Sequence, residues 1–234
     1  VRLHPLYNNK EYVNKVMTTR YIRKTIAIDL KKSYNDLWKG YSKNNQRNIT
    51  KAKNLGLSAE IATKTLTNIT KFQQLYELTM KRTNSSKYYY FHKSFFSELL
   101  SEDSLYESYL LFANYQNQVV GGIILLIGME FAHYQFGASH PDYLNLKPNN
   151  FLFDFMIRFC QEKGAKLLHL GGGYEENDGL FRYKSTFSNS DHYSYYLGTN
   201  IHDQKVFEQL NEIASKYDSY NPNFFPAYRS VLSK

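Results

Sequence analysis

The stretch Lys166–Ser188 reads KLLHLGGGYEENDGLFRYKSTFS. It opens with the apolar run Lys166–Leu170, which is typical of a buried parallel strand. Three glycines follow, Gly171, Gly172 and Gly173. They let the backbone turn sharply and let a ligand approach the main chain, although a turn that binds nothing would use the same residues. The pattern therefore predicts a candidate substrate-binding edge where the strand ends.

Two cations follow the glycines in the segment Asp178–Ser188. If this segment is extended, Arg182 and Lys184 point the same way. Beside a helix N-terminus, two such cations would hold a phosphate or a carboxylate. The alternative is that both are surface charges that pair with Glu175, Glu176 or Asp178. Arg182 is predicted to bind substrate, and Lys184 is predicted to be catalytic.

A helix is predicted to begin at Pro148, in the first-turn position that proline favours, and to end at Gly164. Its N-terminal amides would face the carboxyl ends of neighbouring strands, which is an anion-binding position. Asn149 and Asn150 lie in this first turn and are predicted to contact substrate. Helices that merely connect two parallel strands have the same geometry, so the position alone does not establish a ligand.

The rest of the chain predicts an α/β (mixed α+β) fold, with a mixed central sheet and helices on both faces. Strands are expected at residues 21–28, 57–61, 106–115, 118–127, 131–138 and 192–197. Helices are expected at residues 33–56 with a break near Gly40, at 68–82, at 93–100 and from Asp203 onward. Ser33 and Asp36 form a capping-box pattern. The last helix is expected to bury Val206, Phe207, Leu210, Ile213 and Tyr217.

The composition of the 234 residues, with 42% hydrophobic and 21% charged residues, is that of a globular protein. The longest apolar run, Val119–Met129, is too short to span a bilayer and predicts a buried strand. A single cysteine, Cys160, excludes an internal disulfide framework and indicates a reducing compartment. We therefore expect a cytoplasmic protein.

The formal net charge of +8 favours polyanionic partners such as nucleic acid, nucleotide phosphates, lipid pyrophosphates or an anionic membrane face. A solvated basic surface is the alternative. A basic helix that carries Lys43, Arg47, Lys51 and Lys53 could contact tRNA or lipid phosphate.

Other catalytic chemistries find little support in the sequence. The seven histidines show no HExxH or paired-ligand spacing, so no metal is expected. There is no GxSxG elbow, and Cys160 lies on the apolar stripe of a predicted helix, which disfavours a nucleophilic enzyme. His133 lies in the middle of a strand that borders the predicted site. It is either a satisfied core histidine or a catalytic base.

The motifs LHLGGG at 168–173, Asp178, LFRYK at 180–184 and FS at 187–188 resemble the C-terminal signature of FemAB-like GNAT acyltransferases. That group includes peptidoglycan bridge aminoacyltransferases. Further segments resemble the family in the same order, at 43–57, 79–91 and 224–229, so the likeness spans residues 30–229. FemAB-like proteins contain two GNAT-like halves. The resemblance implies that residues 1–28 end a truncated N-terminal half and that 29–234 form the C-terminal GNAT-like acyltransferase domain.

The resemblance implies an N-acyltransferase in which an amino group of a cell-envelope precursor, peptidoglycan or surface glycan, attacks an activated acyl or aminoacyl group directly. Lys184 would contact a substrate phosphate or the reacting carboxyl end, while Arg82 and Tyr89 would face the acceptor. The donor would be acyl-CoA or aminoacyl-tRNA. The resemblance also implies that the protein binds an anionic donor, that tRNA is a candidate partner, and that the protein contacts the inner membrane face peripherally.

The loop Ser139–Asn150 departs from the pattern of CoA-dependent GNAT enzymes, which usually carry a glycine-containing turn before the crossover helix. This loop contains no glycine, so both donors stay open. The alternative function is a non-catalytic glycan- or peptide-binding module that retains the GNAT fold, with Tyr88–Phe91 gripping the ligand.

Overall fold

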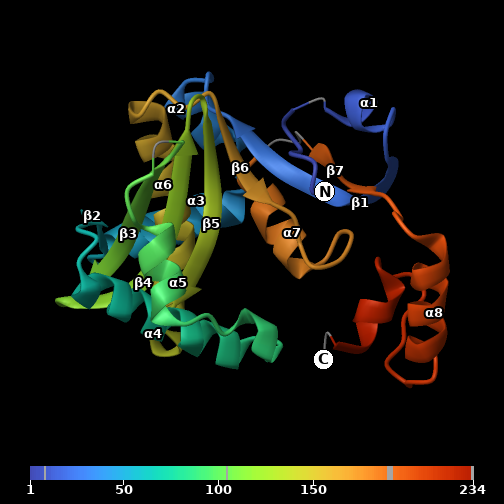
Figure 1. The fold of residues 1–234 in the computed structure, drawn as a ribbon. Coiled ribbons are helices and arrows are strands. Elements are labelled where there is room, and N and C mark those ends of the chain that lie inside the picture. Colours follow the sequence, from blue (N-terminus) through green and yellow to red (C-terminus); the bar gives the residue numbers. More distant parts are fainter. Residues whose placement is uncertain (8, 104, 189–191, 233–234) are drawn as a thin grey trace.

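The computed structural model describes residues 1–7, 9–103, 105–188 and 192–232. Its centre is one seven-stranded sheet with the strand order β2-β3-β4-β5-β6-β1-β7 (Figure 1). The strands are β1 (Thr18–Asp29), β2 (Ser58–Ala62), β3 (Glu107–Tyr115), β4 (Gln118–Gly128), β5 (Phe131–Ser139), β6 (Leu167–Gly171) and β7 (His192–Thr199). β5 and β6 pair in parallel, and the other five neighbouring pairs are antiparallel. The predicted mixed sheet is confirmed.

Helices cover both faces of this sheet, as predicted (Figure 1). One face carries α2 (Tyr34–Gly40), α3 (Lys43–Asn54), α6 (Pro148–Glu162) and α7 (Gly179–Ser185). The other face carries α4 (Leu66–Arg82) and α5 (Lys93–Leu99). The remaining helical segments are α1 (Lys10–Val13), η1 (Lys87–Tyr89), η2 (Pro141–Leu146), α8 (Gln204–Ala214) and η3 (Ala227–Leu232). Among the described residues, none of these helices combines the length and the apolar character that crossing a membrane requires.

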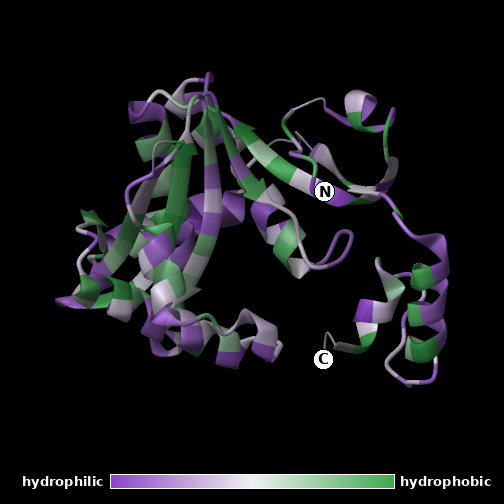
Figure 2. Ribbon diagram, in the orientation of Figure 1, coloured by the Kyte–Doolittle hydropathy of each residue, from purple (hydrophilic) through white to green (hydrophobic). Residues whose placement is uncertain are grey.

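The alternation of side chains along β4 divides the core into two clusters. Ile123 and Leu125 point to the cluster that includes α6, whereas Ile124 points to the cluster that includes α4. Because both faces of β4 are covered, its sequence is a continuous apolar run rather than an alternation. β4 accordingly carries mostly hydrophobic colouring (Figure 2).

The predicted helix boundaries follow from local capping. The Ser33 hydroxyl accepts a hydrogen bond from the Asp36 backbone N–H at 3.2 Å, and Asp203 accepts one from the Val206 N–H at 2.9 Å. The break predicted near Gly40 separates α2 from α3, and Ser42 caps the second helix. These predictions are confirmed.

The condition under which Arg182 and Lys184 would point the same way is not met. Residues 179–185 form the helix α7, capped by Asp178, and are not extended. Arg182 and Lys184 are therefore two positions apart on a helix and point to different sides.

The apolar positions of α8 are also less buried than predicted. Val206, Leu210, Ile213 and Tyr217 are 46%, 38%, 57% and 60% exposed. The physical reason is placement, because α8 and η3 form a small unit beyond the outer ends of β1 and β7, away from the main core (Figure 1).

The N-terminal residues join the same sheet. β1 spans the predicted boundary between residues 28 and 29 and lies between β6 and β7. The Leu3 backbone N–H donates to the Tyr196 carbonyl at 3.0 Å, which fixes the segment before β1 against β7. The division into two GNAT-like halves stays a prediction.

A buried carboxylate joins α2, α3 and α6. Asp154 on α6 is fully buried and accepts hydrogen bonds from the Tyr34 hydroxyl at 2.7 Å and from Lys53 Nζ at 3.2 Å. Arg158 Nε lies 3.5 Å from the same carboxylate. Since a buried charge is tolerated only when it is paired, these contacts fix the relative positions of the three helices.

We expect Asp154→Ala to lower the free energy of unfolding by about 2 kcal/mol, because two cations and the hydroxyls of Tyr34 and Tyr41 lose their partner. All of these groups except the Tyr41 hydroxyl remain partly accessible to water. Urea denaturation monitored by tryptophan fluorescence would measure the change. The control is Glu130→Ala, which breaks an exposed pair with Lys166 and should cost less than about 1 kcal/mol. Equal losses in the two variants would contradict a structural role for the Asp154 contacts.

Candidate active site

The candidate site forms where β5 and β6 separate. Their parallel ladder consists of three residue pairs and ends at His133 and His169. β5 continues along β4 to Ser139, whereas β6 stays beside β1 and ends at Gly171. A register shift in the β4–β5 ladder lies just past the point of separation. Among the described residues, the edge of β5 beyond His133 therefore has no neighbouring strand on the β6 side. At its end Thr79 Oγ1 bonds both the N–H and the carbonyl of Ser139, and the backbone between His133 and Ser139 is the part that a ligand could pair with.

Lys184 lies beside this opening. Its side chain is only 6% exposed, and Nζ donates a hydrogen bond to the Gly172 carbonyl at 2.9 Å. Nζ also lies 5.4 Å from the centre of the Tyr134 ring. Burial lowers the pKa of Lys184 to about 8, and the charge of Asp178 opposes this shift. At neutral pH the side chain is therefore a buried cation, and it loses its proton as the pH rises through about 8.

Asp178 organises the loop that carries the glycines to α7. One carboxylate oxygen accepts from the Tyr174 and Glu175 backbone N–H groups at 2.6 and 3.2 Å, and the other accepts from the Phe181 N–H at 2.8 Å. Burial acts to raise the pKa of this carboxyl, but the backbone N–H groups outweigh it and lower the pKa. Asp178 thus closes the loop and caps α7 at once, which fixes the position of Lys184.

All three glycines are required by geometry. At Gly172 a Cβ atom would lie 2.7 Å from the backbone oxygen of Lys24 on β1. Gly171 has φ +74°, a left-handed conformation that favours glycine. At Gly173 a Cβ atom would collide with the Asp178 carboxylate. The Arg23 guanidinium donates to the carbonyls of Gly173 and Tyr174, which attaches this loop to β1. This segment, Gly171–Gly173, which we call the glycine edge, is therefore held in place by Asp178 on one side and by Arg23 on the other.

The start of α6 lies next to the carboxyl end of β5. Lys147 precedes the helix in a left-handed conformation and gives no side-chain cap. Pro148 has no N–H and the Phe151 N–H donates to the Lys147 carbonyl, so the N–H groups of Asn149 and Asn150 are the ones that an anion could bind. Asn149 Nδ2 approaches Ser139 Oγ at 3.5 Å. Asn150 is buried, and its Nδ2 donates to Asn45 Oδ1 on α3 at 2.8 Å. A substrate contact of either asparagine stays a prediction.

The remaining predicted residues surround the opening at different distances. Tyr89 lies in η1, and its ring centre is 5.7 Å from that of Tyr174 in the glycine loop. Arg182 donates to the Asn177 carbonyl at 2.9 Å and so turns toward its own loop rather than toward Lys184. Arg82 is exposed at the end of α4 and makes no hydrogen bond or ion pair within the described part of the chain. Lys184, the glycines and His133 are the group that the fold brings together.

Sequence reasoning missed His169. His133 Nδ1 and His169 Nδ1 are 2.9 Å apart, and the two rings stack with centres separated by 5.0 Å. Burial lowers the pKa of His133 to about 4, aided by the charges of Lys184 and His4, and burial also lowers the pKa of His169. The sequence did carry a signal. His169 alternates with Leu168 and Leu170 on a strand that was predicted to lie beside the strand of His133.

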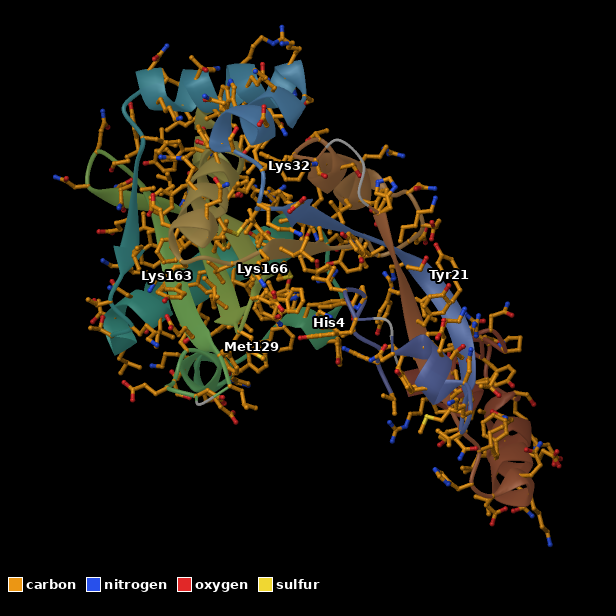
Figure 3. The ribbon with its side chains drawn as sticks, turned by 90° about the horizontal axis from the view of Figure 1, so that it is seen from above. His4, Tyr21, Lys32, Met129, Lys163 and Lys166 are labelled. Carbon is orange, nitrogen blue, oxygen red and sulfur yellow. The ribbon has the colours of Figure 1, made fainter. Side chains whose placement is uncertain are left out.

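A pocket of about 430 Å³ opens next to this histidine pair. It is lined by Arg2, Leu3, His4, Pro5, Arg23, Thr25, His133, His169, Gly171, Gly172, Gly173 and Tyr195. The view from above places His4 between the main body, marked by Lys166, and the outer part of β1, marked by Tyr21 (Figure 3). No group of three histidine, cysteine or acidic side chains suited to a metal ion occurs among the residues that the structure describes. Four features thus lie around one opening: the buried cation Lys184, the glycines, the start of α6, and the histidine pair. This arrangement suits the attack of an amine on an activated acyl group.

Solved structures with this fold include FemX, with a TM-score of 0.63 and 15% identity over 81% of this chain. A C-terminal DUF2156 domain from Agrobacterium fabrum, which carries the name lysylphosphatidylglycerol synthetase, has a TM-score of 0.58 and 13% identity over 86% of the chain. L-PGS from Bacillus licheniformis has a TM-score of 0.58 and 10% identity over 85% of the chain. The chain spans 64% of the FemX chain and 67% of each of the other two. At these identities the likeness establishes the fold.

No curated protein matches the chain in sequence. The family model of the acetyltransferase (GNAT) domain matches residues 41–185, which include α3, the β3–β5 meander, α6, the glycine edge and Lys184. This match covers more than half of the chain and ends directly after Lys184. The chain belongs to the GNAT acetyltransferase domain family.

Proposed function

We propose that the protein transfers an acyl or aminoacyl group from an anionic donor to an amino group of a cell-envelope precursor, by direct attack of the amine. The observation that carries this proposal is the buried Lys184 cation at the point where β5 and β6 separate. Two solved structures with this fold carry the names FemX and lysylphosphatidylglycerol synthetase. These names support an acceptor from the cell envelope.

In the proposed reaction the amine nitrogen forms a bond to the acyl carbon, and the bond from that carbon to the oxygen or sulfur of the donor breaks. The developing negative charge on the carbonyl oxygen is stabilised by Lys184 and by free backbone N–H groups of β5. No covalent enzyme intermediate is needed, because the protein contributes position and electrostatic stabilisation. Arg82 and Tyr89 are proposed to contact the acceptor from the rim of the opening.

The distribution of charge supports a large polyanionic donor. Between Leu30 and Leu57, seven Lys and Arg side chains and one Asp leave a net charge of +6, out of +8 for the whole chain. Those that are exposed and make no ion pair among the described residues are Lys31, Lys32, Lys39, Lys43, Arg47 and Lys51. A surface of this kind suits the backbone of a nucleic acid.

This basic surface starts at the candidate site. The Ser42 N–H donates to the Thr186 carbonyl at 2.8 Å, and Asn45 Nδ2 donates to Thr186 Oγ1 at 2.7 Å. α3 thus runs outward from the end of α7, two residues beyond Lys184. A donor with its acyl end at Lys184 could place further phosphates along α3. Aminoacyl-tRNA is therefore favoured over acyl-CoA.

A glycan- or peptide-binding module without catalysis is the alternative. It draws on an exposed aromatic group, since Tyr88 and Tyr174 are 73% and 56% exposed and both pack edge-on against Tyr89. Exposed aromatic faces suit sugar rings as well as acceptor peptides.

Lys184→Ala is expected to lower the rate of acyl transfer by about 100-fold, because it removes the cation nearest the developing charge. In the intact protein the rate should also fall as the pH rises through about 8, where Lys184 loses its proton. Lys184→Arg should keep part of the activity and lose this decline, since a guanidinium stays charged. The assay would follow transfer from alanyl-tRNA and from acetyl-CoA to a lysine-containing stem peptide of peptidoglycan.

Lys71→Ala on α4 is the matched control, because it removes an exposed lysine outside the site, and its rate should equal that of the intact protein. If Lys184→Ala transfers as fast as this control, the assignment of Lys184 is wrong. If the intact protein transfers from neither donor and still binds a glycan, the module is the better reading.

The donor is testable through α3. The triple variant Lys43→Gln, Arg47→Gln and Lys51→Gln is expected to weaken tRNA binding and to reduce the slope of log affinity against log salt by about 3. Fluorescence anisotropy with labelled tRNA would measure both quantities. Acetyl-CoA binding, followed by thermal shift, should change little.

The control for this experiment removes the same total charge elsewhere, through Lys71→Gln, Lys93→Gln and Lys205→Gln, which lie on α4, α5 and α8. These three should leave tRNA binding unchanged. An equal loss in both triple variants would show that net charge alone attracts RNA. Stabilisation by acetyl-CoA without any binding of tRNA would favour CoA as donor.

A further inference from the structure

We propose that the pocket beside β5 and β6 binds the amino group of the acceptor, and that Nε2 of His169 accepts the proton which the amine loses. We also propose that Arg2 and Arg23 bind an anionic group, a carboxylate or a phosphate, close to that amine. This inference rests on the proposed acyl transfer and adds to it the chemical class of the acceptor. It assigns the histidines a joint role that neither residue could have alone.

The central observation is an unpaired nitrogen. His169 is only 6% exposed, and its Nε2 is buried without a hydrogen-bond partner among the residues that the structure describes. A buried polar atom without a partner destabilises the fold, so such atoms are rare and often belong to binding or catalytic sites. His169 is also one of the residues that line the pocket. A ligand N–H in the pocket would supply the missing partner.

The contact between the two rings fixes their protonation in a complementary way. Both rings are neutral at pH 7, because their pKa values are lowered by burial. The contact of 2.9 Å between the two Nδ1 atoms then requires one Nδ1 to donate and the other to accept. A neutral imidazole carries one proton, so the donor ring has a bare Nε2 and the acceptor ring has a protonated Nε2. The pair therefore always contains one basic Nε2.

The charged groups around the pair favour an uncharged amine. Lys184 from α7 acts on both His133 and His169, and Arg2 and Arg23 line the same pocket. Within the described part of the chain, no carboxylate lines the pocket. A positive surrounding lowers the pKa of an incoming amine and so raises the fraction of its nucleophilic free base.

The same surroundings favour an anionic neighbour of the amine. Nη1 of Arg23 is bound by the carbonyls of Gly173 and Tyr174, which positions the guanidinium at the pocket wall. Its other nitrogens, and the whole guanidinium of exposed Arg2, make no hydrogen bond among the described residues. Guanidinium groups bind carboxylate and phosphate through paired hydrogen bonds. An acceptor such as an amino acid side chain near a carboxylate meets this requirement.

The glycine edge lies between the pocket and Lys184. Gly171 lines the pocket, and a Cβ atom built on it would lie 3.5 Å from Lys184 Nζ. The absence of a side chain here leaves room for an acyl carbon between the amine and the cation. The amine would approach from the histidine side, and the developing oxyanion would face Lys184.

The proton transfer balances within the pair. When the amine nitrogen has bonded to the acyl carbon, it carries an excess proton, which passes to His169 Nε2. The proton on His169 Nδ1 can then move to His133 Nδ1, so the positive charge is shared by the two rings. The pair returns to its neutral state when this proton leaves to the donor's leaving group or to water.

Imidazole 15N NMR on the intact chain tests binding without any need for a donor. At pH 7 we expect neutral rings in opposite tautomers for His133 and His169. β-Alanine should shift the Nε2 resonance of His169. Propylamine, which lacks the carboxylate, should bind about tenfold more weakly because it loses a charge-assisted hydrogen bond to arginine. Equal tautomers, or no shift with β-alanine, would overturn the proposal.

Kinetics separate proton transfer from a purely structural role. With whichever donor, alanyl-tRNA or acetyl-CoA, supports transfer, His169→Asn should reduce kcat for an alkylamine acceptor by about 100-fold. The loss should be much smaller for methoxyamine, whose adduct gives up its proton readily to water. His133→Asn should behave similarly. A structural defect would instead lower both rates equally.

His202→Asn, an exposed histidine beyond β7, is the matched control and should keep both rates. Thermal unfolding would verify that each variant is folded, and His169→Gln provides a second substitution if the asparagine variant is not. If no donor supports transfer, the proposed function fails, and the NMR titration still decides whether the pocket binds an amine next to an anion. Equal losses for both acceptors in both variants would overturn the role of the pair as proton acceptor.

Discussion

The early end of the β5–β6 ladder is the constraint on which the rest of the site depends. Three residue pairs hold the two strands together, and beyond His133 and His169 each strand follows a different neighbour. Because backbone groups at a free strand edge need partners, the separation creates hydrogen-bonding capacity inside the fold. Lys184, the glycine edge and the start of α6 all lie around this one opening. The sheet itself therefore determines where a substrate can reach the backbone.

Burial makes the charges at this opening effective and also makes them costly. Lys184 contacts a carbonyl and an aromatic ring and makes no ion pair among the described residues, and the charge of Asp178 acts on it from further away. An ion pair would hold the ammonium more firmly, but it would also neutralise the field that a developing oxyanion requires. Asp178 differs, because its carboxylate accepts hydrogen bonds from backbone N–H groups and these bonds fix the conformation of the loop. The two charged residues thus have separate tasks, one structural and one electrostatic.

Much of this architecture could be predicted from the sequence, since it depends on local patterns. The apolar run of β4, the cap at Ser33 and Pro148 at the start of α6 each specify an element by its own residues. The sequence does not decide the conformation of residues 179–185, because their helix is set by the Asp178 cap and is short enough that periodicity gives little signal. α8 was misread for the opposite reason, because its periodicity is clear but its position beyond the sheet is a tertiary property.

The contacts that make the site depend on pairing, which single positions do not reveal. His133 was visible as a polar residue in a strand, but its meaning changes with the register that places His169 opposite it. The parallel order of β5 and β6 was predicted, and the register was not. A shift by one residue would place Leu168 or Leu170 opposite His133 and point the two side chains to opposite faces of the sheet. The chemistry at this opening is thus a consequence of strand register, and the same hydrogen bonds that align β5 with β6 align one imidazole with the other.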